Sequence, residues 1–171
     1  MQQELIQEFA EQSILRIDEN TEKIEKCFTQ LSQDEIWKSP NDSSNSIGNL
    51  VLHLCGNIRQ YAISSLGKTT DIRQRDEEFS KGQSLPKEDL LQRLKDTTEE
   101  AKSIISKADI DNLLRKRNVQ GYYFSGMGVV IHVTEHYSYH TGQIALLTKL
   151  WKNKDLGFYA GIDLNAMNNE Q

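Results

Sequence analysis

The sequence predicts an all-α protein, a four-helix bundle with one long crossover. Apolar residues recur at helical spacing in four long segments of the chain. Its only two prolines, Pro40 and Pro86, fall where a helix is expected to end or begin. The longest segment without such spacing, residues 67–86, lies between the second and third helices. In a four-helix bundle, one long crossover joins two helices that run parallel.

The first expected helix covers residues 4–31, with Glu, Asp and Lys opposite its apolar face. Ser32 and Glu35 then have the spacing of a capping box for a short helical turn. A polar loop, residues 38–45, leads to the second long helix.

The second expected helix, residues 46–66, contains one charged residue, Arg59. The stripe opposite its apolar arc is uncharged and consists of Ser46, Asn49, His53, Asn57, Gln60 and Ser64. A face in contact with water usually carries Lys and Glu, as the first helix does. We therefore expect the uncharged stripe to line an internal site.

The third helix is expected from Pro86 to about Ser106, and the fourth over residues 125–151. The expected inward series of the fourth helix is Val129, Val133, His136, His140, Ile144, Leu147 and Trp151. The tail, residues 152–171, is expected to dock through Leu156, Phe158 and Tyr159 and otherwise to fray. At this length, residues 1–171 are expected to form a single domain.

Composition narrows the class of protein. A net charge of −5 argues against a nucleic-acid-binding surface. We find no apolar run long enough for a membrane helix and no signal peptide, which predicts a cytoplasmic protein. Cys27 and Cys55 stand alone in separate helices, so we expect two reduced core thiols.

A line of histidines in the fourth helix is the strongest chemical signal. His132, His136 and His140 follow at intervals of four and share one helix face. Neighbours are about 6 Å apart along the axis, close enough for two rings to bind one ion. The outer two are about 12 Å apart, so all three do not readily bind the same ion. Spacing alone does not choose between the pairs His132/His136 and His136/His140.

Several other chemistries lack support. Tyr137 follows His136 where a zinc protease has its glutamate base. The chain has no Gly-rich phosphate loop and no Gly-x-Ser-x-Gly nucleophile elbow.

Two segments resemble the signature segments of the DinB-like superfamily. They are the run from Ser46 to Asn57 (SIGNLVLHLCGN) and the run from His136 to Gln143 (HYSYHTGQ). That superfamily includes damage-inducible DinB proteins and YfiT-type metal-dependent hydrolases, and its relatives include bacillithiol S-transferases. Mycothiol-dependent enzymes such as maleylpyruvate isomerase are more distant relatives.

The resemblance implies an up-down-down-up bundle and a site for one divalent metal ion. The implied ligands are His53, His136 and His140, with His132 outside the ligand set. Zinc or nickel is the expected metal, with iron or manganese as further possibilities, and many such proteins are homodimers. Three protein ligands leave a position for water or substrate, as in catalytic zinc sites.

Residues around the implied ligands are candidates to support them. Four could orient a ligand ring or a metal-bound water, namely Asn57, His132, Glu135 and Gln143. Alternatively, Gln143 could serve only a helix contact beside Gly142, and the side chain of Glu135 could point into solvent. Arg73 and Arg75 could bind a substrate carboxylate, or could pair with nearby acidic residues. We expect the tyrosines Tyr61, Tyr137 and Tyr139 to pack rather than to act as acids.

The favoured function is therefore a metal-dependent enzyme with a small-molecule substrate. A thiol S-transferase would use the ion to lower the pKa of a low-molecular-weight thiol such as bacillithiol. A hydrolase acting through metal-bound water is the first alternative, and a non-catalytic metal-binding stress-response bundle is the second. The sequence identifies no catalytic residue beyond the metal ligands.

Overall fold

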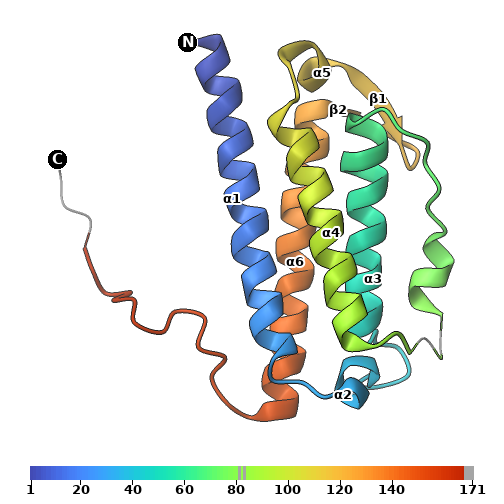
Figure 1. The fold of residues 1–171 in the computed structure, drawn as a ribbon, viewed down its shortest axis with the longest axis vertical. Helices are drawn as coiled ribbons and strands as arrows, with labels where there is room; N and C mark the ends of the chain where they lie inside the picture. Colours follow the sequence, from blue (N-terminus) through green and yellow to red (C-terminus); the bar gives the residue numbers. More distant parts are fainter. Residues whose placement is uncertain (81, 83, 168–171) are drawn as a thin grey trace.

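The computed structural model describes residues 1–80, 82 and 84–167. Within these residues, four long helices form a bundle: α1 Gln2–Phe28, α3 Ile47–Ile58, α4 Lys87–Ser106 and α6 Gly126–Lys152. Figure 1 shows α1 and α6 running down the bundle, and α3 and α4 running up. The all-α fold and its up-down-down-up order are confirmed. No helix in the described part of the chain is both long and apolar enough to cross a membrane.

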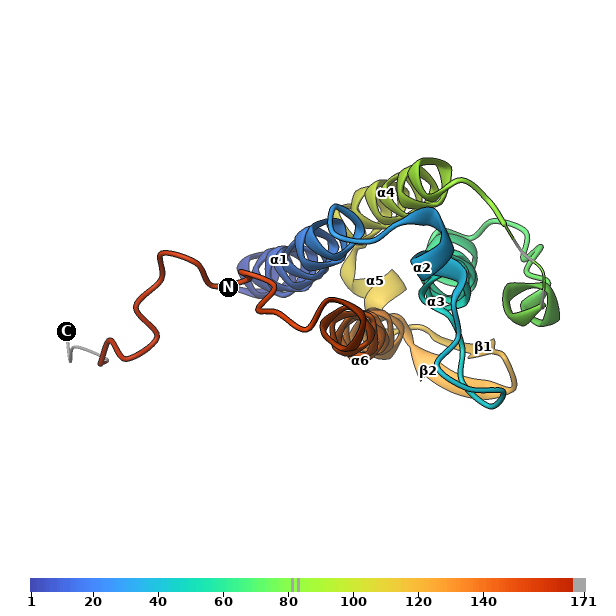
Figure 2. The ribbon, with the colours of Figure 1, turned by 90° about the horizontal axis from the view of Figure 1, so that it is seen from below.

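The crossover runs along the outer side of α3, as the two perpendicular views in Figures 1 and 2 show. It joins α3 to α4, which lie parallel and in contact. Part of it is regular, because Arg75–Phe79 forms one 3₁₀ segment, η2, that packs against α3. The crossover therefore covers α3 from outside the bundle.

Side-chain caps mark the starts of α3 and α6 and of the short helix that precedes α3. The Ser46 hydroxyl accepts from the Asn49 N–H at 3.1 Å at the start of α3. The Ser125 hydroxyl does the same for the N–H of Gly128 at the start of α6. The expected capping box of Ser32 and Glu35 is present and begins the short helix α2 Gln33–Trp37. Such caps satisfy backbone donors that the first turn leaves unpaired.

Two regions differ from the sequence-based expectation. The second helix is α-helical only to Ile58 and continues as a π-helical segment, η1 Arg59–Leu66. The connector before α6 holds a short helix, α5 Ile110–Leu114, and an antiparallel hairpin of β1 Lys116–Val119 and β2 Tyr122–Ser125. Strands of four residues are too short for apolar alternation to reveal them.

The uncharged stripe of α3 is covered rather than exposed. Ser46, His53, Asn57 and Ser64 are each at most 7% exposed. The crossover segment η2 and helix α6 both pack against α3 and provide this cover. The expectation that this stripe faces the interior is confirmed for these four residues, whereas Asn49 and Gln60 are only partly buried.

The inward face of α6 corrects one expectation. Val129, Val133 and Ile144 are buried as expected, but His136 is only half-buried. The core position at that level belongs to Tyr137, whose hydroxyl lies 2.9 Å from the hydroxyl of Thr21 on α1. Successive residues on a helix point about 100° apart. With Tyr137 in the core, His136 turns toward α3.

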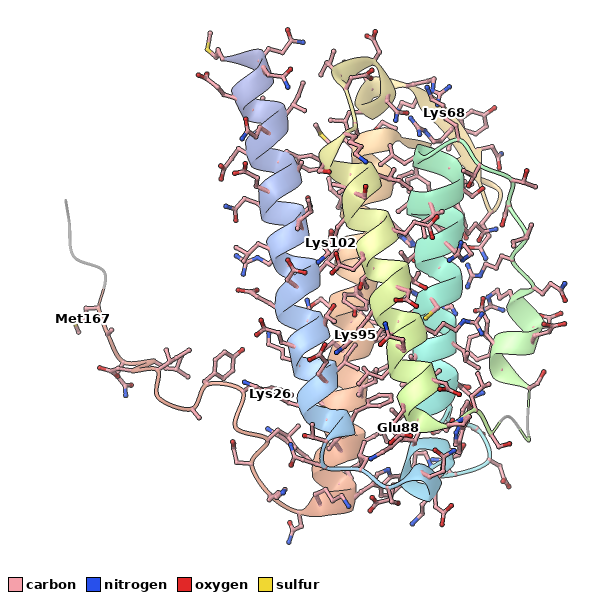
Figure 3. The ribbon with its side chains drawn as sticks, in the orientation of Figure 1. Lys26, Lys68, Glu88, Lys95, Lys102 and Met167 are labelled. Carbon is pink, nitrogen blue, oxygen red and sulfur yellow. The ribbon has the colours of Figure 1, made fainter. Side chains whose placement is uncertain are left out.

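The helices α1 and α4 form a charged outer face. Lys102 pairs with Asp18 at 2.6 Å and Lys95 with Glu25 at 2.8 Å, and Figure 3 shows both lysines between these helices. The expected tail contacts are present in part. Leu156 is buried and Phe158 packs on the core, whereas Tyr159 is 52% exposed. The end of the tail, residues 168–171, lies outside the described residues.

Candidate metal centre

Three histidines from two helices meet on the inner side of α3 and α6. His53 extends from α3, and His136 and His140 extend from successive turns of α6. One nitrogen from each ring can be chosen so that all three atoms lie within 4.8 Å of one another. The Nε2 atoms of His53 and His136 are 2.9 Å apart. The structure thus brings together the pair His136/His140 and adds His53 to it.

Burial keeps the α6 histidines in the neutral state that binds metal ions. Burial, with the neighbouring His140 and His53, lowers the pKa of His136 to about 3. Burial likewise lowers the pKa of His140, although the hydrogen bond to Gln143 opposes this shift. A neutral imidazole presents one nitrogen with a free lone pair.

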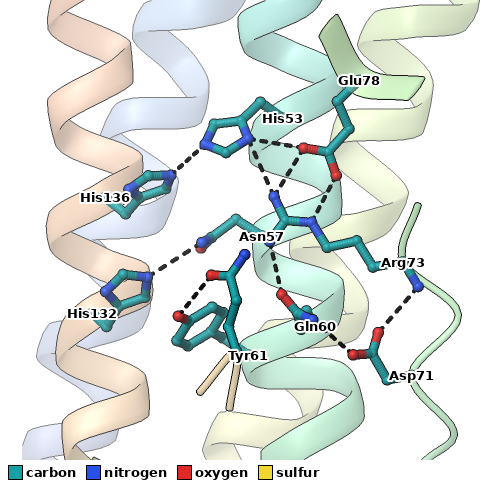
Figure 4. Close-up of polar contacts among 10 residues, drawn as sticks. His53, Asn57, Gln60, Tyr61, Asp71, Arg73, Glu78, His132 and His136 are labelled. Atoms are coloured by element: carbon teal, nitrogen blue, oxygen red, sulfur yellow. Dashed lines mark hydrogen bonds and ion pairs between the residues drawn. The ribbon is translucent and has the colours of Figure 1, made fainter. Parts of the chain in front are cut away.

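The second ring nitrogen of His53 is bound to a carboxylate that the sequence did not suggest. The Nδ1 atom of His53 lies 2.8 Å from Oε2 of Glu78, which comes from η2 in the crossover (Figure 4). The phenyl ring of Phe79 packs against the same imidazole, with ring centres 4.9 Å apart. Glu78 accepts the Nδ1–H proton, which leaves the Nε2 lone pair of His53 facing the cluster.

Gln143 contacts His140 as expected for a residue that orients a ligand. The Nδ1 atom of His140 lies 2.7 Å from Oε1 of Gln143, one turn further along α6. An amide oxygen only accepts, so Nδ1 carries the proton and Nε2 of His140 is free.

His132 lies outside the cluster. Its ring stacks on Tyr61 at 4.1 Å and on His136 at 5.3 Å between ring centres. Its Nε2 atom is 3.2 Å from Nδ2 of Asn57, so Asn57 supports His132 rather than the expected His53 (Figure 4). The Oδ1 atom of Asn57 is buried and has no hydrogen-bond partner among the described residues.

Glu135 is not brought to the cluster. Its side chain is exposed and lines a shallow surface groove between α1 and α6. Being one position before His136, it points about 100° away around the helix. Of the tyrosines, Tyr61 and Tyr137 are buried packing residues, while Tyr139 is 62% exposed with its ring edge against His140.

The two crossover arginines have different environments. Arg73 binds a carboxylate, but that carboxylate belongs to Glu78, at 2.7 and 2.8 Å through Nε and Nη2. The expected pairing with nearby acidic residues is thus present for Arg73, in a buried rather than a solvated form. Arg75 is exposed and lies 5.0 Å from the centre of the Phe79 ring.

The donor set fits a small divalent ion. Ligands about 2.05 Å from a tetrahedral ion are about 3.3 Å apart, close to the 2.9 Å between the first two nitrogens. Among the described residues, no other His, Cys, Asp or Glu atom joins the group. His136 is only partly buried, so solvent reaches the cluster from its side. The three-histidine cluster could hold a metal ion, with no fourth His, Cys, Asp or Glu ligand among the residues that the structure describes.

Comparison with known proteins agrees with this architecture. Residues 4–160 match the profile of a family described as a protein of unknown function, DUF1572. The chain belongs to the DUF1572 family. No curated protein matches it.

Solved structures place this family member among DinB-like folds. A DinB-like protein, YjoA, from Bacillus subtilis is similar with a TM-score of 0.64 and 16% sequence identity, over 84% of this chain and 94% of that chain. A DinB-like protein from Bacillus cereus gives a TM-score of 0.61 and 14% identity, over 77% of this chain and 85% of that chain. The resemblance to the DinB-like superfamily is confirmed at the level of the fold.

Proposed function

We propose that this protein binds one divalent metal ion through the Nε2 atoms of His53, His136 and His140. The observation that carries the proposal is the convergence of three imidazoles whose ligand atoms lie within 4.8 Å. Two of the rings have their Nδ1 atoms bound to Glu78 and Gln143, which leaves their Nε2 atoms available. Metal-bound histidines usually show this arrangement, with the second ring nitrogen bound to a neighbouring acceptor.

Zinc and nickel are the ions that the ligand set favours. Imidazole nitrogens suit zinc, nickel, copper and iron, whereas manganese prefers oxygen ligands. All three proposed ligands are imidazoles, and the carboxylate of Glu78 is bound to Arg73 and His53. Manganese therefore ranks below zinc and nickel, and iron ranks below them because the affinity of such sites for divalent ions rises from iron to nickel and zinc.

We further propose that the protein is a metal-dependent enzyme acting on a small molecule. Three protein ligands and solvent access beside His136 leave room for a substrate atom or a water. A bound ion would supply Lewis acidity, lowering the pKa of a coordinated thiol or water. The protein's residues would bind the ion in a partly buried site and limit its contact with water.

The reaction that we favour is transfer of a low-molecular-weight thiol to an electrophile. The nucleophile must then come from the substrate, because Cys27 and Cys55 are both buried and burial raises the pKa of each thiol. The net charge of −5 supports a small-molecule partner rather than a nucleic acid. The expected homodimer and cytoplasmic location stay predictions.

A paired assay separates the candidate functions. Protein loaded with zinc or nickel is given glutathione or bacillithiol with a chromogenic aryl halide, and separately a nitrophenyl ester without thiol. Thiol-dependent conjugation that is lost on chelation supports the transferase, and ester hydrolysis that is lost on chelation supports the hydrolase. If the metal-loaded protein shows neither activity, the result indicates a metal-binding bundle without catalysis. Activity unaffected by chelation contradicts the mechanism.

A further inference from the structure

We propose that Arg73 and Glu78 form a positioning pair, which sets the proton position and the orientation of the His53 ring. This inference rests on the proposed metal site and assigns the crossover a part in it. The pair would keep the proton of His53 on Nδ1 and direct its Nε2 atom at His136 and His140. Gly56, which has no side chain, would leave the space on α3 that the pair occupies.

The positioning pair is built as an internal ion pair rather than as a surface contact. The side chain of Arg73 is 2% exposed and that of Glu78 is 9% exposed. The guanidinium donates to both carboxylate oxygens, through Nε to Oε1 at 2.7 Å and Nη2 to Oε2 at 2.8 Å. This two-point geometry fixes the plane of the carboxylate. Gln60 on η1 accepts from Arg73 Nη1 at 2.9 Å and donates to Asp71 at 2.7 Å, which anchors the far side.

The distances around His53 decide where its proton lies. Its Nδ1 atom is 2.8 Å from the Glu78 carboxylate and 3.2 Å from Nη2 of Arg73. A carboxylate only accepts and a guanidinium only donates, so the shorter contact requires a proton on Nδ1. The guanidinium offsets the negative charge of Glu78, which reduces the cost of burying that charge beside the ring.

Gly56 makes the close approach of the positioning pair possible. It lies three residues after His53, on the part of α3 that the pair covers. A Cβ atom at this position would lie 1.8 Å from Oε1 of Glu78 and 3.0 Å from Nε of Arg73. Any side chain here would push the carboxylate away from α3. Gly56 therefore leaves the space that the carboxylate of Glu78 needs to contact His53.

The alternative is that the pair only fastens the crossover to α3. A purely structural tie would change thermal stability but leave the proton on His53 where it is. The proton position and the metal affinity therefore separate the two roles.

The first test measures cobalt(II) affinity in Glu78→Leu, with Asp76→Asn as the matched control. Both changes remove one negative charge from η2, but Asp76 is exposed. Loss of a residue that supports a metal-bound histidine typically weakens affinity by about tenfold to a hundredfold. We expect that loss, with a shifted cobalt absorption spectrum, in Glu78→Leu only. Equal affinity in Glu78→Leu and wild type would overturn the proposal.

The second test uses glycine substitutions, which leave every polar side chain in place. Gly56→Ala displaces the carboxylate and should weaken cobalt(II) binding by about tenfold or more. Gly142→Ala is the matched control, because a Cβ there meets no atom within 4 Å. Normal affinity in both variants would contradict the role of Gly56.

The third test needs no metal. Nitrogen-15 NMR of the histidine rings in the metal-free protein should show His53 protonated on Nδ1 in the wild type. In Glu78→Leu, which removes the acceptor, the proton should move toward Nε2, because Arg73 Nη2, 3.2 Å from Nδ1, can then donate to it. An unchanged proton position would refute the pair even if metal binds. If the wild type binds no metal but the proton still moves in the variant, the result would refute the metal site and leave the positioning pair standing.

Discussion

The Nε2 atoms of His53 and His136 lie 2.9 Å apart, although 83 positions separate the two residues in the sequence. Two nitrogen lone pairs repel each other at this distance, so a proton or a cation must lie between them. Because the two rings come from α3 and α6, the site exists only when these helices are packed together. The candidate metal centre is thus a property of the folded bundle rather than of one helix.

Replacing His132 should leave metal binding intact. His132→Phe keeps the ring stacked between Tyr61 and His136 but removes the nitrogen that faces Asn57. We expect the same metal content as in the wild type, measured by elemental analysis. Loss of the ion in this variant would show that His132 is a ligand and that the choice of His140 is wrong.

Gln143 should support metal affinity through His140. Gln143→Leu removes the acceptor 2.7 Å from Nδ1 of His140, so the ring loses its fixed orientation. We expect affinity to fall by about tenfold, measured by competition with a chromogenic chelator. Gln143→Glu keeps an acceptor at the same reach and should bind at least as tightly as the wild type. Equal affinities in all three proteins would contradict the role of Gln143.

The two cysteines should be unreactive in the folded protein. Burial raises the pKa of Cys55 from its ordinary 9.0 to about 11, and burial also raises that of Cys27. The folded state holds these protons more tightly than the unfolded state. Their contribution to stability is therefore complete below pH 9 and is lost as the pH rises toward 11. Mass spectrometry after iodoacetamide treatment at pH 8 should find no alkylation in the native protein and two modified cysteines in urea. Rapid native alkylation would contradict this burial.

Tyr137 should matter for stability and not for metal binding. Tyr137→Phe keeps the buried ring but removes the hydroxyl that meets Thr21 at 2.9 Å. A hydrogen bond of this kind contributes about 1 kcal/mol to the free energy of unfolding. Urea denaturation should show a loss near that value, with unchanged metal content. A large loss of metal in this variant would place Tyr137 in the site.

Much of the bundle could be predicted from the sequence, because amphipathic spacing and capping residues act locally. The uncharged stripe containing His53 and the line of His132, His136 and His140 were also visible, although spacing did not choose between the two neighbouring pairs. Joining them into one site required the family resemblance, because helix spacing does not say which faces meet. Gln143 was recognisable for the same local reason, since it lies one turn from His140.

The features that could not be predicted from the sequence depend on contacts between distant segments. The sequence left open whether Arg73 binds a substrate or pairs with an acidic neighbour, and only the burial of Arg73 and Glu78 against Gly56 reveals the positioning pair. The glycine at position 56 was the sequence signal that could have indicated a close approach to α3 at this point. Glu135 was grouped with the histidines by sequence distance, although its helix angle points it outward. The hairpin before α6 was too short to have a pattern.

Metal content tests the central claim most directly. Untagged wild-type protein is incubated with zinc or nickel, dialysed and measured by elemental analysis beside His53→Ala, His136→Ala and His140→Ala. Circular dichroism confirms that each variant is folded. We predict about one ion per chain in the wild type and its loss in each variant. A wild type without metal, or folded variants that keep the full amount, would contradict the three-histidine centre.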